Sequence, residues 1–306
     1  MARRVKLILN PMADLGQAWR AANDLRPIVA EYGNADWSGT VYPTHASELA
    51  QRAALDGYDM VIAMGGDGTV HEVINGLMQV PPEKRPILGV VPIGSGNDFA
   101  YAAGIPVEAD RALAHALNGE PTPIDLVLMT DEHGRKEYFD NTLGIGFDAL
   151  VTLYSHKLPV VRGVLMYFIA VIQTIFFKHV PARMEFETDG EKWVEENLML
   201  VLCNGPREGG GFMLAPAAKL DDGLIDYILV RKLGRAMMLR LVPEFMKGTH
   251  QRFSQVKTGR CKRLSLVSNK PLYMHADGEI MTDFSSNLKS ATFEVLPGAL
   301  RVVRGK

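Results

Sequence analysis

Short aliphatic runs alternate with amphipathic segments over the first 130 residues of the chain. A short continuous apolar run is typical of a buried strand, whereas apolar positions spaced three and four apart indicate a helix. We therefore expect strands at residues 5–9, 39–42, 60–64, 87–91 and 124–129, and helices at residues 17–32, 46–55 (with Thr44 as a candidate N-cap), 70–78 and 109–117. Strands that alternate with helices predict a largely parallel sheet covered on both faces, which is a three-layer α/β domain.

The pattern changes after about residue 130. Residues 183–188 alternate strictly, with Met184 and Phe186 on one face and Glu185 and Glu187 on the other, which is typical of a half-buried antiparallel strand. Further strands are expected at residues 198–203, 224–230, 264–267, 292–296 and 300–303, and they are interrupted by an apolar segment at 160–177 and a helical segment at 235–246. We therefore predict an α/β domain over residues 1–130 and a β-sandwich over residues 131–306, whose last residues could return to the first domain.

Composition and charge narrow the classes of protein that fit. A chain of 306 residues is long enough for two domains, and 33 Lys and Arg against 35 Asp and Glu give a net charge of −2, which argues against a nucleic-acid partner. The only cysteines are Cys203 and Cys261, too few for a disulfide framework. The first apolar run ends at Asn10-Pro11 and is too short for a signal peptide, so we expect a cytoplasmic protein.

One segment carries a strong chemical signal. Gly65-Gly66-Asp67-Gly68-Thr69 follows an expected strand and precedes an expected helix. Glycines there allow backbone N–H groups to approach an anion, and the helix N-terminus attracts negative charge, so the segment predicts a phosphate-binding loop. A tight strand-to-helix turn is the structural alternative. The sequence matches neither GxxxxGK[ST] nor GxGxxG, so a nucleotide would be held by another arrangement.

Several further motifs follow one another along the chain. They are Asn10-Pro11, Thr44, Gly65 to Thr69 with Glu72, Pro92-Ile93-Gly94-Ser95-Gly96-Asn97-Asp98-Phe99-Ala100, Gly144-Ile145-Gly146-Phe147-Asp148-Ala149, Pro216-Ala217 with Asp221-Asp222-Gly223-Leu224, and Asp277-Gly278-Glu279. Taken together, these motifs resemble those of the diacylglycerol kinase and sphingosine kinase superfamily, most closely its soluble bacterial lipid kinase branch. GGDGT alone is shared with NAD kinases, whereas the NDFA stretch and the late Asp-Gly-Glu separate the two groups. The resemblance implies an NAD kinase-like α/β domain followed by a β-sandwich.

The resemblance also implies roles for individual residues. ATP would be contacted by Asn10, Thr44, Gly65, Gly66, Asp67, Gly68, Thr69, Glu72 and Ser95, and the catalytic Mg²⁺ would be approached by Asp67, Asp98 and Asp125. Glu279 would take the proton of the acceptor hydroxyl, with Asp277 polarising or positioning it, although Asp-Gly is also a strong hairpin signal. A separate Mg²⁺ would be held by the Asp222 carboxylate and by the backbone carbonyls of Lys219 and Leu224, with a plain Asp-Gly turn as the alternative.

The chain departs from the family pattern at three places. Asp14 puts a carboxylate after Asn-Pro where the family has small residues and glycine, Ser95 replaces threonine but keeps the hydroxyl, and His71 stands where asparagine is common. Neither of the last two exchanges removes a donor that phosphate binding needs.

The resemblance implies an ATP-dependent lipid kinase that acts on a lipid alcohol such as diacylglycerol and serves phospholipid biosynthesis. An NAD kinase-like phosphotransferase and a non-catalytic lipid-binding protein are the alternatives. We expect ATP, Mg²⁺, a lipid alcohol and a transient membrane-surface contact as partners, no nucleic acid, and a location in the cytoplasm at the inner membrane surface; a homodimer stays open.

Residues 164–177 are the candidate for the lipid contact. As a helix they would span about 21 Å, short of a hydrocarbon core of about 30 Å, so they predict either a buried helix or one that lines an acyl-chain site or touches the membrane interface. The basic residues Arg252, Lys257, Arg260, Lys262 and Arg263 form either a membrane-facing patch or a solvated strand face.

Overall fold

The computed structural model describes residues 2–155, 163–177 and 181–305. The chain forms two compact units: unit 1 contains Met1–Leu126 and Pro297–Lys306, and unit 2 contains Val127–Leu296. The strands β5 (Pro121–Asp131) and β17 (Ser290–Val303) each begin in one unit and end in the other.

Unit 1 is built on a parallel sheet in the order β4–β3–β1–β2. Its strands are β1 (Val5–Leu9), β2 (Ala35–Gly39), β3 (Met60–Gly65) and β4 (Ile87–Pro92), and Val302 of β17 pairs in parallel with Leu88 of β4. Every residue of β3 and β4 is buried. This two-sided burial explains why both strands read as continuous apolar runs rather than as alternating patterns.

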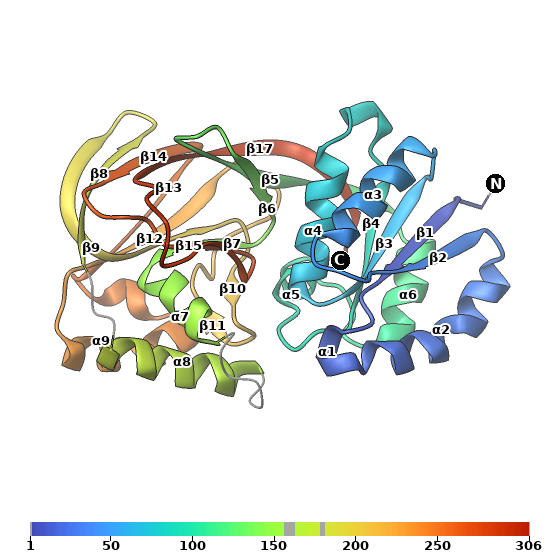
Figure 1. Ribbon diagram of the computed structural model, residues 1–306, viewed down its shortest axis with the longest axis horizontal. Coiled ribbons are helices and arrows are strands. Elements are labelled where there is room, and N and C mark those ends of the chain that lie inside the picture. The colour runs from blue at the N-terminus through green and yellow to red at the C-terminus, as the bar shows by residue number, and fades with distance from the viewer. Residues whose placement is uncertain (1, 156–162, 178–180, 306) are drawn as a thin grey trace. The chain divides into compact units, whose positions relative to one another are not determined.

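Helices cover both faces of this sheet. The helices are α1 (Ala13–Gly16), α2 (Ala18–Tyr32), α3 (His45–Leu55), α4 (Asp67–Met78), α5 (Asp98–Ala102) and α6 (Ala109–Asn118), with a 3₁₀ turn at Pro82–Lys84. Helix α2 packs against α6 on one face, and α3 packs against α4 on the other (Figure 1). The predicted three-layer α/β arrangement is confirmed.

One expected strand of unit 1 is wrong. Residues 39–42 were expected to be extended, but the strand is Ala35–Gly39, and Val41 and Tyr42 are exposed. The pairing explains why β2 ends at Gly39. Strand β2 lies at the edge of the sheet and pairs with β1 from Val5–Ala35 to Leu9–Gly39, and β1 itself ends at Leu9.

Unit 2 is rich in strands. These are β6 (Lys136–Phe139), β7 (Thr142–Gly146), β8 (Ala182–Thr188), β9 (Lys192–Cys203), β10 (Arg207–Glu208), β11 (Phe212–Met213), β12 (Ile225–Arg231), β13 (Val256–Cys261), β14 (Arg263–Ser268), β15 (Met274–Ala276) and β16 (Glu279–Thr282). Its helices are α7 (Phe147–Ser155), α8 (Gly163–Phe177) and α9 (Arg235–Lys247), with a 3₁₀ turn at His250–Arg252.

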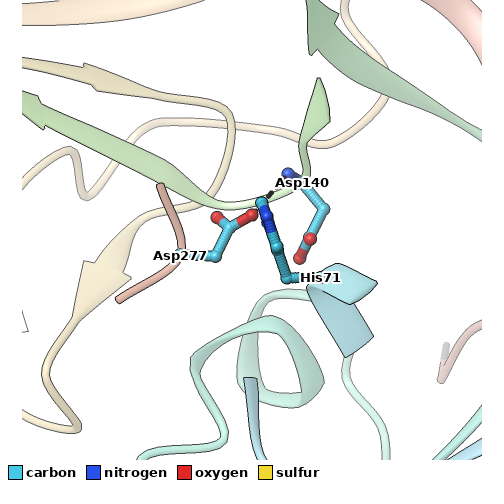
Figure 2. Close-up of side chains that lie close together, drawn as sticks. All are labelled: His71, Asp140 and Asp277. Atoms are coloured by element: carbon cyan, nitrogen blue, oxygen red, sulfur yellow. Dashed lines mark hydrogen bonds between the residues drawn. The ribbon is translucent and has the colours of Figure 1, made fainter. Parts of the chain in front are cut away.

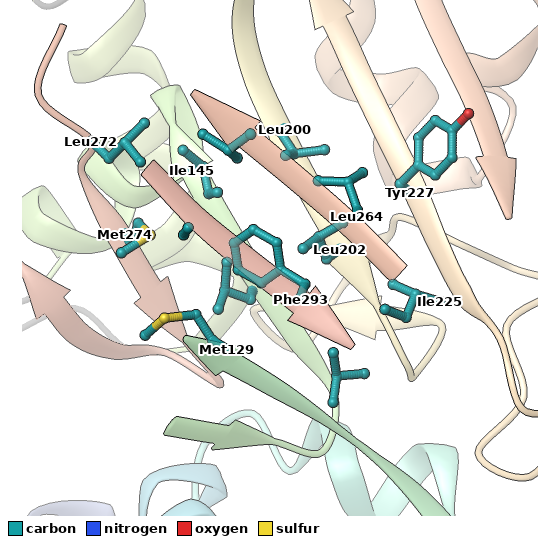
Figure 3. Packing of buried hydrophobic residues seen from close by; sticks show 14 of the residues in the cluster. Met129, Ile145, Leu200, Leu202, Ile225, Tyr227, Leu264, Leu272, Met274 and Phe293 are labelled. Carbon is teal, nitrogen blue, oxygen red and sulfur yellow. The ribbon is translucent and has the colours of Figure 1, made fainter. Parts of the chain in front are cut away.

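The predicted β-sandwich is confirmed. The long strand β9 belongs to both of its sheets. Its first half pairs with β8, which continues to β14 and β17, whereas its second half lies between β7 and β12. Leu202, Leu264 and Phe293 belong to the apolar core of this sandwich (Figure 3). Met184 and Phe186 of β8 are buried in this core, as the alternation predicts.

A second apolar core covers the outer face of β9 and β12. Met199 and Val201 of β9 pack there with residues of α7, α8 and α9, which lie together on one side of unit 2 (Figure 1). Since Leu200 and Leu202 face the sandwich core, β9 is buried on both sides. This is why residues 198–203 show no alternation.

Two further expectations changed in detail. Residues 292–296 and 300–303 are parts of the single strand β17, which continues through Pro297 and Gly298. The apolar segment at 160–177 contains α8, and its residues 160–162 lie outside the described residues. Among the residues that the structure describes, we find no helix with the length and apolar character needed to cross a membrane.

Candidate functional site

The phosphate-loop residues of unit 1 lie where adjacent parallel strands end. Asn10 follows β1, Gly65 closes β3 and Gly94 comes shortly after β4. The strand order reverses between β1 and β3, and ligands of open parallel α/β sheets bind at the carboxyl ends of the strands beside such a point. The fold therefore brings three separate motifs to one edge of the sheet.

Asn10 and Thr69 join the ends of β1 and α4. The Asn10 side-chain amide donates a hydrogen bond of 3.1 Å to the Thr69 hydroxyl, and the Asn10 backbone N–H donates to the Met64 carbonyl at 2.9 Å. A methyl group on Gly65 would lie 2.3 Å from the same hydroxyl, so only glycine fits there. These contacts hold the end of β1 against the first turn of α4.

The loop after β4 touches the GGDGT loop through two glycines. A methyl group on Gly94 would lie 2.4 Å from the Gly66 Cα atom, so the two backbones are in direct contact. Asn97, with a φ of 52°, holds this loop by accepting from the Gly94 N–H at 3.0 Å and donating to the Gly94 carbonyl at 2.8 Å. Ser95 between them is exposed. The two loops therefore pack directly against each other at the N-terminus of α4.

The Glu72 side chain caps the N-terminus of α3. Its two carboxylate oxygens accept from the backbone N–H groups of Thr44 at 2.8 Å and of Ala46 at 3.0 Å, at the N-terminus of α3. Thr44 is the predicted N-cap, but it has a φ of 71° and no capping hydrogen bond from its side chain, because Glu72 supplies the cap. Thr44 itself is exposed.

Two of the three acidic residues expected near Mg²⁺ come together. Asp67 is the first residue of α4, and its Oδ1 accepts from the backbone N–H of Phe99 at 3.1 Å, one residue after the buried Asp98 that opens α5. Asp125 is buried on β5 and accepts from the backbone N–H of Gly298 at 2.8 Å. Carboxylate oxygens are ligands that Mg²⁺ prefers, so the chemistry of Asp67 and Asp98 fits this ion.

The segment with the expected base folds as the Asp-Gly signal predicts. Strands β15 and β16 form a hairpin in which Ala276 pairs with Glu279, and the turn residues Asp277 and Gly278 have φ of 51° and 85°. Positive φ at both positions is the mark of a type I′ turn. Glu279 opens β16 and is exposed.

The Asp277 carboxylate is engaged by backbone groups. It accepts hydrogen bonds from the N–H groups of Asn141 and Thr142, each at 3.0 Å. It also accepts from the N–H group of Asp140 at 3.2 Å (Figure 2). Its own N–H donates to the Thr142 carbonyl at 2.8 Å. Asp277 therefore anchors the hairpin to the start of β7, and it can position Glu279 through the turn.

The expected second Mg²⁺ site contains a pair of acidic residues. Asp222 Oδ1 accepts from the Leu224 N–H at 3.2 Å, and Lys219 is exposed. Burial and the nearby Asp222 carboxylate raise the pKa of Asp226, although Arg260 contacts it at 3.0 Å. The other Asp226 oxygen is buried without a hydrogen-bond partner among the described residues. An orphaned carboxylate oxygen beside Asp222 fits a bound cation.

Sequence reasoning missed a buried charged cluster in unit 2. His275 Nε2 lies 3.0 Å from Asp148 Oδ2 and 3.3 Å from Glu208 Oε1. Burial alone would lower the pKa of His275, but the Glu208 charge and the hydrogen bond and charge of Asp148 raise it to about 9. The three residues are widely separated in sequence, so the one available signal was the Gly144 to Ala149 motif, which had no assigned role.

An apolar cavity lies beside this cluster. Its volume is about 70 Å³, and part of it is open to solvent. Fourteen of its sixteen lining residues are apolar, and the other two are Asp148 and Glu208. Val171 and Ile175 of α8 and Leu241 of α9 contribute to its wall, so the apolar segment of the sequence does line a cavity.

The basic residues near the C-terminus are partly used inside the protein. Arg252 pairs with Glu244 at 2.8 Å, Arg260 pairs with Asp226, and the Lys257 ammonium lies 3.7 Å from the centre of the Trp193 ring. These contacts within the protein favour a solvated strand face over a membrane-facing patch for the basic residues.

Family models match most of the chain. The diacylglycerol kinase catalytic domain matches residues 4–129, and the YegS C-terminal NAD kinase beta sandwich-like domain matches residues 141–304. The two matches correspond to the α/β part and to the β-sandwich.

Similar proteins carry the same family name. A diacylglycerol kinase from Bacillus subtilis is 31% identical over 90% of this chain and 90% of that protein, and one from Mycobacterium tuberculosis is 30% identical over 98% and 95%. The crystal structure of a diacylglycerol kinase from Bacillus anthracis has a TM-score of 0.74 and 22% identity, covering 99% of this chain and 97% of that one, and shows the same fold.

Proposed function

Since the chain belongs to the bacterial diacylglycerol and lipid kinase family, we propose that it transfers the γ-phosphate of ATP to the hydroxyl of a lipid alcohol such as diacylglycerol. The observation that carries this proposal is the cavity of unit 2, whose almost wholly apolar wall has the chemistry that an acyl chain would contact. An apolar wall with two carboxylates does not suit a polar dinucleotide, which speaks against the NAD kinase alternative.

In this proposal unit 1 binds ATP. The phosphates would lie on the N–H groups of the GGDGT loop and of the loop around Gly94, where the dipole of α4 also favours anions. Asn10 and Glu72 would support these loops through the contacts described above. Asp67 and Asp98 would hold Mg²⁺, which when bound neutralises charge on the phosphates, and Asp125 would contribute from β5.

Glu279 would act on the acceptor. As the lipid hydroxyl oxygen forms a bond to the γ-phosphorus, its proton passes to the Glu279 carboxylate, and the bond from phosphorus to the bridging oxygen breaks to release ADP. Exposure of Glu279 at the start of β16 leaves its carboxylate accessible to a substrate. Asp277 would act as a positioning residue because it fixes the turn that precedes Glu279.

The second Mg²⁺ would be structural. We assign its carboxylate ligand to Asp222 and its carbonyl ligands to Lys219 and Leu224, with the orphaned oxygen of Asp226 close by. This ion would neutralise the pair of carboxylates at the start of β12.

Helix α8 would give access to the lipid. Its inner face lines the cavity, whereas Leu165, Phe168, Phe176 and Phe177 are exposed on its outer surface. Four large exposed apolar side chains on one helix suit an interaction surface, and the short helix suits a position in the membrane interface. The enzyme would then work in the cytoplasm and bind the inner membrane surface transiently.

A direct assay tests the proposal. The full-length protein is incubated with Mg²⁺ and ATP, and with dioctanoylglycerol, with NAD or with no acceptor, and the products are identified by mass spectrometry. We expect ADP formation to depend on the lipid and a phosphorylated lipid to appear. Phosphorylated NAD would support the alternative function, and lack of turnover with every lipid alcohol would leave a non-catalytic lipid-binding protein.

A further inference from the structure

The cavity of unit 2 has a charged cluster on its otherwise apolar wall. Asp148 and Glu208 line the cavity, and His275 behind them contacts both carboxylates. All three residues are buried, His275 completely. None of them takes part in the transfer step described above, so their position beside the cavity requires a separate explanation.

The sequence makes room for this cluster at one glycine. Gly144 of β7 pairs with His275 of β15, and a methyl group on Gly144 would lie 2.0 Å from Asp148 Oδ2 and 2.3 Å from His275 Nε2. Gly146, with a φ of 80°, ends β7 and lets α7 begin, which places Asp148 in the first turn of that helix. The Gly144 to Ala149 motif therefore builds the cluster.

Glu208 reaches the cluster from a different segment. Residues 207–213 form the short hairpin of β10 and β11, with Glu208 opposite Phe212. Phe212 also lines the cavity. The hairpin thus supplies one carboxylate and one aromatic ring to the same wall.

The charge of the cluster is negative in either protonation state of the histidine. Two carboxylates and one imidazolium sum to −1, and two carboxylates with a neutral imidazole sum to −2. Carboxylates accept hydrogen bonds and do not donate them. A ligand group that meets this wall must therefore donate hydrogen bonds or carry positive charge, whereas an anionic group is repelled in a medium of low dielectric constant.

We propose that Asp148, Glu208 and His275 form a head-group cluster that accepts an uncharged lipid alcohol and excludes a lipid with an anionic head. The hydroxyl or glycerol oxygens of the acceptor would donate to the carboxylates, and His275 is a positioning residue that holds both of them. The inference rests on the proposed function, because it takes the acyl chains to occupy the cavity. It narrows the acceptor from any lipid alcohol to one without negative charge.

The same hairpin connects this cluster to the proposed base. His275 lies on β15, Asp277 fixes the turn, and Glu279 opens β16. One hairpin therefore carries both His275, which holds the two carboxylates, and the proposed base Glu279.

Binding of lipids with equal chains and different heads tests the proposal without relying on turnover. The probes are 1,2-dioctanoylglycerol, its anionic 3-hemisuccinate, and the cationic 1,2-dioctanoyl-3-trimethylammonium-propane, measured by calorimetry with the full-length protein. We expect the neutral and cationic lipids to bind at least tenfold more tightly than the anionic lipid. Equal affinity for all three overturns the head-group cluster but leaves the lipid site intact, whereas absence of binding for all three overturns the lipid site itself.

Variants that remove one charge test whether the head-group cluster causes the preference over the anionic lipid. Asp148→Asn and Glu208→Gln keep the shape of each side chain, and each is expected to reduce the preference over the anionic lipid severalfold. Glu294→Gln, an exposed carboxylate of β17 in the same unit, is the matched control and should keep the wild-type preference. A preference that survives in both folded test variants shows that the cluster has only a structural role; should both fail to fold, the wild-type series alone decides.

Discussion

Asp67 Oδ1 accepts a hydrogen bond of 3.1 Å from the backbone N–H of Phe99, so the first turns of α4 and α5 are tied together by one carboxylate. Asp67→Asn keeps an oxygen for this contact but removes the negative charge. We expect Mg²⁺ affinity in the presence of ATP to fall by about 10- to 100-fold, while the melting temperature changes little. Mg²⁺ titration of turnover and thermal melting measure the two effects.

Asp110→Asn on α6 is the control for this change, since Asp110 is an exposed carboxylate of the same unit. A variant at Asp67 that melts early but keeps its Mg²⁺ dependence would show that this carboxylate serves folding alone.

Removal of the Glu279 carboxylate tests the assignment of the base. Glu279→Gln should bind ATP normally and lose about 10²- to 10⁴-fold in kcat, because loss of a general base has effects of this size. ATP binding by calorimetry and single-turnover kinetics separate the two steps. Turnover close to that of the wild-type protein would exclude Glu279 as the proton acceptor, and Glu294→Gln again serves as the control.

A structural Mg²⁺ at Asp222 predicts a stability effect that needs no nucleotide. A ligand that binds only the folded protein raises the free energy of unfolding, so Mg²⁺ alone should raise the wild-type melting temperature. Asp222→Ala should abolish the rise that this site produces. If the variant and the wild type show equal shifts in a Mg²⁺ titration, the ion does not bind there.

The outer face of α8 should matter only when the lipid is in a membrane. Phe176 and Phe177 are 51% and 75% exposed, so aspartate at either position adds a charge at little cost to the core. We expect at least one of Phe176→Asp and Phe177→Asp to stay folded, to phosphorylate a water-soluble short-chain lipid normally, and to fail on vesicles.

Val267→Asp on β14 controls for added charge, because Val267 is also an exposed apolar residue of unit 2. Full activity of both phenylalanine variants on vesicles, or unfolding of both, would contradict the membrane contact.

The pKa of His275 predicts how stability depends on pH. This pKa is raised to about 9, above the value of about 6.5 in an unfolded chain, so the folded state binds the proton more tightly. The stabilisation is complete below about pH 6.5 and is lost as the pH rises through 9. His275→Gln should therefore be less stable than the wild type at pH 6, and the difference should shrink toward pH 9.5, as denaturant unfolding at several pH values can show. A constant difference would refute the raised pKa.

Local sequence patterns were sufficient to predict strands whose burial shows as a run or an alternation of apolar residues. The apolar runs at 5–9 and 60–64 gave β1 and β3, and the alternation around Phe186 gave β8. Strand β7 was missed because Gly144 and Gly146 depress its strand propensity, and both are needed for close approach or positive φ. Residues 39–42 were misassigned because the end of an edge strand depends on its partner.

In the candidate site, too, local motifs could be predicted from the sequence, whereas contacts between distant segments could not. The GGDGT loop, the Asp-Gly hairpin and the N-cap position of Thr44 were visible as local motifs. Contacts between distant segments were not: Glu72 capping α3, Asp277 holding residues 140–142, and Glu208 meeting His275 join segments that no spacing rule connects.

The course of β17 has a consequence for synthesis of the protein. Its last residues complete unit 1: Val302 pairs with Leu88, the Gly298 N–H binds Asp125, and the Ala299 carbonyl accepts from Arg85 at 3.0 Å. Domains usually fold in the order in which they leave the ribosome. Here the first unit to be translated also contains residues 297–306, so its complete set of contacts can form only after the whole β-sandwich segment has been synthesised.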